Sequence, residues 1–361
     1  MRCALKETVC FRQVALCLLL AAFFLLATAP QSALAQDEPT IVKDSIRFEP
    51  FTSTCSSCPD YVLRWWPQIS FRVNGPIAAG SQLHVEVFPP GVRKPWKTFD
   101  CNTGPVSAGY WWKVEECGGA KIAQDKGVFY TGLIEFKIGM RNEVLGTDIT
   151  LFTGKAKVGK VTPPFPTPAG SFLYYTDFDW HIPIGLIYLA PGHGVPDFFP
   201  PNFYAEVWLR GKDPNPNSFH LFYQGKEVAK EKGCTSDTYG TDDSRMKQNW
   251  SLVTCEFRYV YRENPDPQHI SKDAPLHDLS KSPGEYEIKM IYKGELARSI
   301  KFTVAADGSF DNGIGTANKM GDNVTIVPVK VIGNQEGVWD RVAWKTGAFF
   351  GNPLTGFTAP P

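Results

Sequence analysis

The sequence has almost no net charge and lacks the local motifs of common enzymes. Its 37 basic residues balance 37 acidic ones, and a near-neutral chain without a basic run offers no electrostatic surface for nucleic acid. It contains no phosphate-binding glycine loop, no dinucleotide-binding glycine pattern and no G-x-S-x-G elbow. The six histidines show no H-x-x-x-H or H-x-H spacing for a metal. These absences favour a non-catalytic protein over an enzyme and predict no cofactor.

Helical periodicity is also missing, apart from a possible short helix within Asp340 to Phe349. The 32 glycines and 29 prolines are too many for long helices. Apolar and polar side chains instead alternate with a period of two, which predicts strands with one buried face. The apolar members of four such segments are Ile69, Phe71 and Val73; Leu83, Val85 and Val87; Ile134, Phe136 and Ile138; and Tyr286, Ile288 and Met290.

The first 35 residues resemble a cleavable signal peptide. Arg2, Lys6 and Arg12 precede the apolar run Val14 to Ala27, and Ala33-Leu-Ala35 supplies the small residues of a cleavage site. An uncleaved membrane anchor is the alternative. No later apolar run is long enough to span a bilayer, so we expect no transmembrane segment in the mature chain. The sequence therefore predicts a secreted protein, whether periplasmic, cell-surface or extracellular.

Six cysteines remain after the leader, and an internal repeat predicts how four of them pair. Trp112 stands five residues before Cys117, and Trp250 stands five residues before Cys255. Upstream of these pairs lie Cys101 and Cys234. Downstream, the segments 132–138 and 284–290 also correspond. We therefore expect the disulfides Cys101–Cys117 and Cys234–Cys255, which leaves Cys55 and Cys58 for each other. An exported chain with an even number of cysteines is typical of an oxidising compartment. The C-x-x-C spacing of Cys55 and Cys58 leaves a redox role open as an alternative to a structural loop disulfide.

The segment from Pro283 to Val304, a turn followed by two alternating strands, resembles the closing hairpin of bacterial extracellular immunoglobulin-like domains. That resemblance and the repeat predict an all-β fold with two tandem β-sandwich domains. The predicted boundaries are domain 1 at 36–161, a proline-rich linker at 162–170, domain 2 at 171–304, and a loop, strand and tail at 305–361.

Two groups of residues are candidate sites. Trp65, Trp66, Trp111 and Trp112 form two adjacent pairs, and neighbours in a strand point to opposite faces. One member of each pair could be exposed for stacking on a sugar or a protein, or it could be covered by another part of the chain. Asp177, Asp179 and His181 would share one face of a strand and could bind a metal; the alternative is a solvated strand face.

The sequence thus predicts an exported, non-catalytic binding or structural protein, with an envelope or extracellular protein or polysaccharide as partner. One alternative is a carbohydrate-binding protein that uses exposed tryptophans. The other is an enzyme, either a C-x-x-C oxidoreductase or a metal-dependent hydrolase.

Overall fold

The computed structural model describes the following residues: 39–54, 62–75, 77–78, 80–101, 111–118, 127–191, 201–211, 218–239, 250–262, 276–320, 324–333, 337–346 and 354–361. The leader, Cys55 and Cys58 lie outside these ranges. The chain divides into two units, Met1–Glu38 and Pro39–Pro361, and all of the described residues belong to the second.

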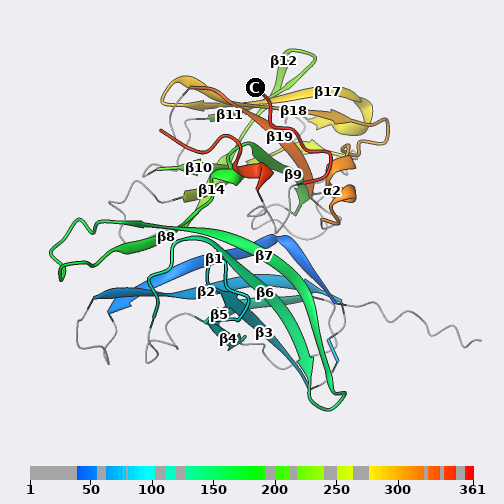
Figure 1. The fold of residues 1–361 in the computed structure, drawn as a ribbon. Coiled ribbons are helices and arrows are strands. Elements are labelled where there is room, and N and C mark those ends of the chain that lie inside the picture. Colours follow the sequence, from blue (N-terminus) through cyan, green and yellow to red (C-terminus); the bar gives the residue numbers. More distant parts are fainter. Residues whose placement is uncertain are drawn as a thin grey trace, which may run out of the picture. The chain divides into compact units, whose positions relative to one another are not determined.

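The described chain is built mostly from antiparallel strands (Figure 1). The first strands are β1 (Thr40–Thr54), β2 (Leu63–Asn74), β3 (Ser81–Phe88), β4 (Lys97–Asp100), β5 (Trp111–Gly118), β6 (Gly132–Asn142), β7 (Thr147–Val161) and β8 (Leu173–Asp177). They form a three-stranded sheet with the order β1-β2-β5 and a five-stranded sheet with the order β4-β3-β6-β7-β8. The prediction of an all-β chain is confirmed.

The edges of these two sheets are held together at both ends. At one end, the hydroxyl of Thr176 in β8 donates a hydrogen bond of 2.6 Å to the carbonyl of Phe48 in β1. At the other end, the Cys101–Cys117 disulfide connects the residue after β4 to β5. The sheets are therefore curled around one core rather than stacked as separate layers.

The core of this region is made by the side chains that the sequence pattern assigned to it. Ile69, Phe71 and Val73, Leu83, Val85 and Val87, and Ile134, Phe136 and Ile138 all lie buried in one cluster. Because successive side chains in a strand point to opposite faces, this alternation fixes which face of each strand turns inward.

The remaining strands form a nine-stranded sheet with the order β12-β11-β17-β18-β19-β9-β10-β14-β13. They are β9 (Ile184–Ala190), β10 (Asn202–Arg210), β11 (Ser218–Tyr223), β12 (Lys226–Lys230), β13 (Gly233–Tyr239), β14 (Trp250–Phe257), β17 (Gly284–Tyr292), β18 (Glu295–Val304) and β19 (Thr325–Val331). A parallel two-stranded ladder joins β15 (Val260–Tyr261) to β16 (His277–Asp278). Tyr286, Ile288 and Met290 lie in the core of this region, as the sequence predicts.

The strand orders of the two regions correspond. The order β4-β3-β6-β7-β8 has its counterpart in β12-β11-β17-β18-β19, and β1-β2-β5 has its counterpart in β9-β10-β14. The nine-stranded sheet differs in that β19 pairs directly with β9 and in having the additional edge strand β13.

The proline-rich segment 162–170 connects β7 to β8, and these two strands pair with each other from Lys157↔Asp177 to Val161↔Leu173. Strand β8 therefore belongs to the same sheet as β7. The change from the first sheets to the nine-stranded sheet comes after Asp177, later than the predicted linker.

One expectation for the C-terminal part needs correction. The region after Val304, expected to begin with a loop, contains the short helix α2 (Gly313–Ala317). In the segment 340–349, where the sequence allows a short helix, the described residues 340–346 contain the 3-10 turn η4 (Ala343–Lys345). The expected strand at 325–332 is present as β19. No helix in the described part of the chain is long and apolar enough to cross a membrane.

Candidate functional site

The best-defined candidate site begins at an irregularity in β1. Val42 pairs with Arg72 and Arg47 pairs with Ser70, so β1 has four residues between these pairs where β2 has one. The hydroxyl of Ser45 fixes the resulting bulge, since it donates to the Val42 carbonyl at 2.5 Å and accepts from the Arg72 amide at 2.7 Å. Bulges of this kind redirect side chains and are common beside functional sites.

Arg47 is the residue of β1 at which regular pairing resumes after the bulge, and its side chain packs against the nine-stranded sheet. Its guanidinium donates hydrogen bonds to the carbonyls of Asp44, at 2.6 Å, and Ile46, at 2.9 Å. The same guanidinium lies 5.4 Å from the ring centres of both Trp208 and Tyr239. The guanidinium lies over both rings, which contact each other with centres 5.3 Å apart, and it gains cation–π attraction in addition to its hydrogen bonds.

The bulge and the sheet enclose a cavity of about 560 Å³, called here the bulge cavity. One wall comes from β1, β2 and β5, and the other from β9, β10, β13 and β14, with Val324 between β19 and α2. Its polar and charged lining residues are Asp44, Ser45, Arg47, Ser70, Arg72, Tyr188, Glu206, Asp237, Tyr239 and Thr254.

Glu206 lies at the middle of the sheet wall, on β10. Its Oε1 accepts a hydrogen bond of 2.5 Å from the Tyr188 hydroxyl on the neighbouring strand β9. Burial raises the pKa of Glu206, and the hydrogen bonds from Tyr188 and Thr254 oppose that rise. Burial also raises the pKa of Tyr188, and the nearby Glu206 carboxylate adds to it. The pair thus holds its protons more firmly than the same groups would in water.

Asp44 faces Glu206 from the bulge side of the cavity. Burial raises its pKa, although a backbone hydrogen bond and the charges of Arg47 and Arg72 act in the opposite direction. Its Oδ1 is buried and has no hydrogen-bond partner among the described residues. An unsatisfied buried oxygen costs about 1–3 kcal/mol, so this oxygen favours any bound group that donates a hydrogen bond.

The chemistry of the bulge cavity is that of recognition. It offers carboxyl groups that accept hydrogen bonds, two guanidinium groups that donate them, and aromatic rings that can cover an apolar face of a ligand. Neither histidine nor cysteine occurs among the described residues that line it. The arrangement therefore supports binding of a polar molecule more directly than nucleophilic catalysis.

The structure does not bring Asp177, Asp179 and His181 together as a metal site. Asp177 ends β8, but Asp179–His181 forms the 3-10 helix η2, so the expected shared strand face is wrong. The His181 ring is stacked between Trp180, with centres 3.3 Å apart, and Trp208, with centres 4.4 Å apart. Within the described ranges, no group of three or more metal-ligating side chains occurs. The solvated-face alternative is also wrong, because all three residues are buried.

Asp179 is instead part of a buried ionic cluster. It lies 3.6 Å from the guanidinium of Arg210 and 3.9 Å from the ammonium of Lys157. Its Oδ2 accepts a hydrogen bond of 3.0 Å from the Asp340 amide. Burial and the neighbouring Asp177 carboxylate raise the pKa of Asp179 to about 6.

Of the two alternatives for Trp65 and Trp66, the structure has the covered one, because neither residue has exposed surface. Trp65 lies in the core, and its indole N–H donates to the Tyr130 carbonyl at 2.9 Å. Trp66 points to the opposite face, where Phe51 and Trp96 pack against it. Trp111 and Trp112 begin β5, and their side chains lie outside what the structure describes.

Both predicted disulfides between described cysteines are present. Cys101 is bonded to Cys117, and Cys234 is bonded to Cys255. The second bond connects directly paired residues of β13 and β14, whereas the first joins two different sheets. The pair Cys55 and Cys58 lies outside the described residues.

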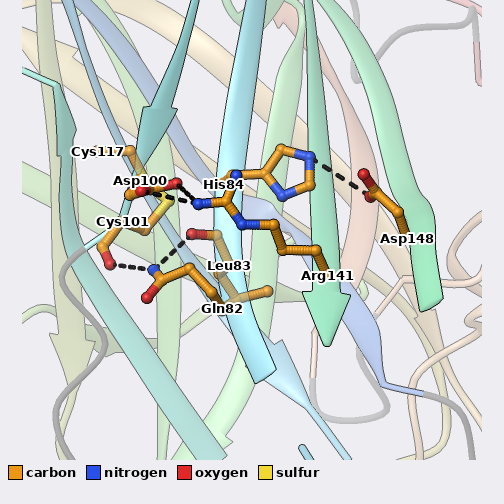
Figure 2. A network of polar contacts seen from close by, with 8 residues as sticks. All are labelled: Gln82, Leu83, His84, Asp100, Cys101, Cys117, Arg141 and Asp148. Atoms are coloured by element: carbon orange, nitrogen blue, oxygen red, sulfur yellow. Dashed lines mark hydrogen bonds and ion pairs between the residues drawn. A yellow bond between two sulfur atoms is a disulfide. The ribbon is translucent and has the colours of Figure 1, made fainter. Parts of the chain in front are cut away.

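A polar network lies beside the buried Cys101–Cys117 bond (Figure 2). Arg141 donates to both carboxylate oxygens of Asp100, at 2.8 and 2.9 Å, and His84 lies 3.7 Å from Asp148. The Gln82 amide donates to the carbonyl of Cys101 at 2.8 Å. These contacts link β3, β4, β6 and β7 across the sheet, and they are typical of a stabilising surface network.

Comparisons with known proteins do not place the chain in a family. No family model matches it, and no curated protein matches it. A solved structure described as a biofilm associated protein, BSP domain, aligns with 87% of this chain at 8% identity and a TM-score of 0.15. This chain spans about 63% of the length of that structure. Similarity at this level does not define a shared fold.

Proposed function

We propose that this chain is an exported, non-catalytic binding protein whose ligand occupies the bulge cavity. The observation that carries the proposal concerns Asp44 on the cavity wall. This residue is half-buried, and its buried Oδ1 lacks a hydrogen-bond partner among the described residues. Buried polar atoms in folded proteins are nearly always satisfied, so an oxygen at a cavity wall that lacks a protein partner can accept a hydrogen bond from a bound group.

The lining indicates the kind of ligand. Asp44 favours a hydrogen-bond donor, while Arg72 on the same wall favours an acceptor. A molecule with both kinds of group and an apolar face for Tyr188 or Tyr239 fits this lining best. Sugars have this combination, so carbohydrate binding is the second candidate function, with the cavity in place of the tryptophan pairs.

Export is supported by the two disulfides and by the sequence of the leader. Disulfides persist in oxidising compartments and are rare in the cytosol. The immunoglobulin-like character and the duplication belong to the same proposal. The duplication is supported by the matching strand orders. It is also supported by the disulfides. Cys101 comes after β4 and is bonded to Cys117 in β5, and Cys234 comes after β12 and is bonded to Cys255 in β14.

The proposal is tested by titrating the purified protein with neutral, acidic and amino oligosaccharides while tryptophan fluorescence is recorded. Trp208 is the expected reporter, because it stacks with Arg47 beside the cavity. We expect a saturable change with at least one class of sugar, and a loss of affinity of at least tenfold in Asp44→Asn and in Arg72→Ala.

The matched control is Asp307→Asn, which removes an exposed carboxylate from a loop remote from the cavity lining. This variant should bind like the wild-type protein. Equal binding by Asp44→Asn, Arg72→Ala and the wild type would exclude the cavity as the site. No response to any sugar would exclude carbohydrate as the ligand.

A further inference from the structure

Strand β13 is an edge strand: within the described part of the chain, no other strand pairs with its outer side. It pairs with β14 along an unbroken register from Gly233↔Glu256 to Tyr239↔Trp250, and it ends the nine-stranded sheet. Most of its residues are exposed. A regular, exposed edge strand presents unpaired backbone groups to any other extended strand.

The disulfide reveals which backbone groups of β13 point outward. The Cα atoms of Cys234 and Cys255 are 4.1 Å apart, which is the spacing of a pair that is not hydrogen-bonded in an antiparallel ladder. The N–H and C=O groups of Cys234, Ser236 and Thr238 therefore point away from β14. None of these groups has a hydrogen-bond partner among the described residues.

The opposite end of the same sheet is protected in ways that β13 is not. Strand β12 has five residues, carries Lys226, Glu227 and Lys230, and has an irregular register with β11. Short length, lysines and bulges are the usual devices against edge-to-edge pairing. Strand β13 has seven residues, no proline, no lysine and one charged side chain, that of Asp237.

We propose that β13 is a self-association edge, at which two copies of this chain pair through their β13 strands in an antiparallel, two-fold arrangement centred on Ser236. In this register Ser236 faces Ser236 of the second copy, and Cys234 faces Thr238. All three outward-pointing residues then form hydrogen-bonded pairs.

The charges of the strand are compatible with this register. Asp237 of one copy faces Thr235 of the other, so no charge faces its like, and a threonine hydroxyl can donate to the carboxylate. The same arrangement at β12 would place Lys226 opposite Lys230, which is repulsive. The charge pattern thus favours a second copy at β13 and disfavours one at β12.

The paired strand would extend one sheet through two molecules and bring their bulge cavities side by side, because Asp237 and Tyr239 line the cavity. The inference does not depend on the identity of any ligand. A single pair of seven-residue strands is smaller than the roughly 800 Å² per partner of a stable interface. We therefore expect association at protein concentrations on the order of 100 µM rather than at nanomolar ones.

The test is sedimentation velocity of the purified protein over a wide range of concentrations. The wild-type protein should shift from monomer to dimer as its concentration rises. Ser236→Pro should remain monomeric, because proline at this position removes an outward N–H and leaves the hydrogen bonds to β14 in place.

A charge-swap pair makes the test specific for the two-fold register. Ser236→Lys and Ser236→Glu should each abolish the dimer, since like charges would then face each other across the axis. An equimolar mixture of the two variants should restore it. The control Lys226→Glu, at the other edge of the sheet, should dimerise like the wild type.

Two results would overturn the proposal. One is a wild-type protein that stays monomeric at every concentration. The other is a dimer that persists unchanged in both Ser236→Pro and Ser236→Lys, which would place the contact elsewhere. Circular dichroism of each variant verifies that the fold is retained.

Discussion

The hydroxyl of Tyr188 donates a 2.5 Å hydrogen bond to Oε1 of Glu206, and both groups are desolvated on the wall of the bulge cavity. Removing this donor leaves a desolvated carboxyl group with one hydrogen bond fewer. We expect Tyr188→Phe to lower the free energy of unfolding at pH 7.5 by about 1–3 kcal/mol, as measured by urea denaturation.

Tyr204→Phe is the control for this change. Its ring stacks on Tyr188, and its hydroxyl donates a long hydrogen bond of 3.3 Å to the Pro191 carbonyl. The loss should therefore be smaller than for Tyr188→Phe. Equal losses in the two variants would contradict the role given to the hydrogen bond between Tyr188 and Glu206.

Arg47 stabilises the bulge and its contact with the sheet at the same time. Arg47→Ala removes two hydrogen bonds and the stacking on Trp208 and Tyr239. We expect a loss of about 2–3 kcal/mol in chemical denaturation. Arg341→Ala removes an exposed arginine that lies 5.0 Å from the Trp339 ring, and it should cost less than about 1 kcal/mol. Similar losses in both variants would contradict the role given to the bulge.

Asp179 should make the stability of the protein depend on pH. Its pKa is about 6 in the folded state and about 3.9 in an unfolded chain, so the folded protein binds the proton more tightly. The resulting stabilisation is present below the unfolded pKa and is lost as the pH rises through about 6. We expect the free energy of unfolding to fall by up to about 3 kcal/mol between pH 4 and pH 7 from this residue.

Asp179→Asn should flatten this part of the profile, because the amide does not titrate. Urea denaturation at four pH values between 4 and 7.5 measures the effect. Asp44 and Glu206, whose pKa values are also raised, contribute in the same direction in both proteins. A profile for Asp179→Asn that parallels the wild type would contradict the assignment to Asp179.

The two described disulfides should contribute similarly to the free energy of unfolding, but they should protect the amides of different strands from hydrogen exchange. Their sequence separations of 16 and 21 residues correspond to about 3 kcal/mol each in the chain-entropy model. We expect Cys234→Ser with Cys255→Ser to increase amide hydrogen exchange in β13 and β14. Cys101→Ser with Cys117→Ser should increase it in β4 and β5. Exchange that rises in the same strands for both double variants would contradict this division.

The sequence alone predicted the buried faces of the strands well, because alternation is a local property. Ile69, Phe71 and Val73 are buried as expected, and the repeat predicted both described disulfides. The pairing follows the matching strand orders: Cys101 and Cys234 come after β4 and β12, and their partners lie in β5 and β14.

The features that the sequence left open or predicted wrongly depend on contacts that no local pattern encodes. Trp66 lies on the outer face of its strand, as alternation requires, but Phe51, Trp96 and the backbone near Gly127 cover it. A Cβ on Gly127 would lie 2.9 Å from the Trp66 ring. Asp177 to His181 alternates like a strand, yet the chain turns into a 3-10 helix after Phe178.

The bulge cavity was not predicted because its walls come from segments far apart in the chain. One local signal was available. Ile41 and Phe48 are both buried, although an odd separation of seven residues would place them on opposite faces of a regular strand. Such a change of phase within an apolar pattern indicates a bulge, and here it marks the position of Asp44 and Arg47.

The two disulfides also determine how the chain responds to pulling forces. The two bonds close loops with sequence separations of 16 and 21 residues. At about 3.4 Å per residue, roughly 50 and 70 Å of chain cannot be extended while the bonds are intact. An oxidised molecule under tension would stretch less than its reduced form by these amounts, and each reduction event would appear as one discrete lengthening step.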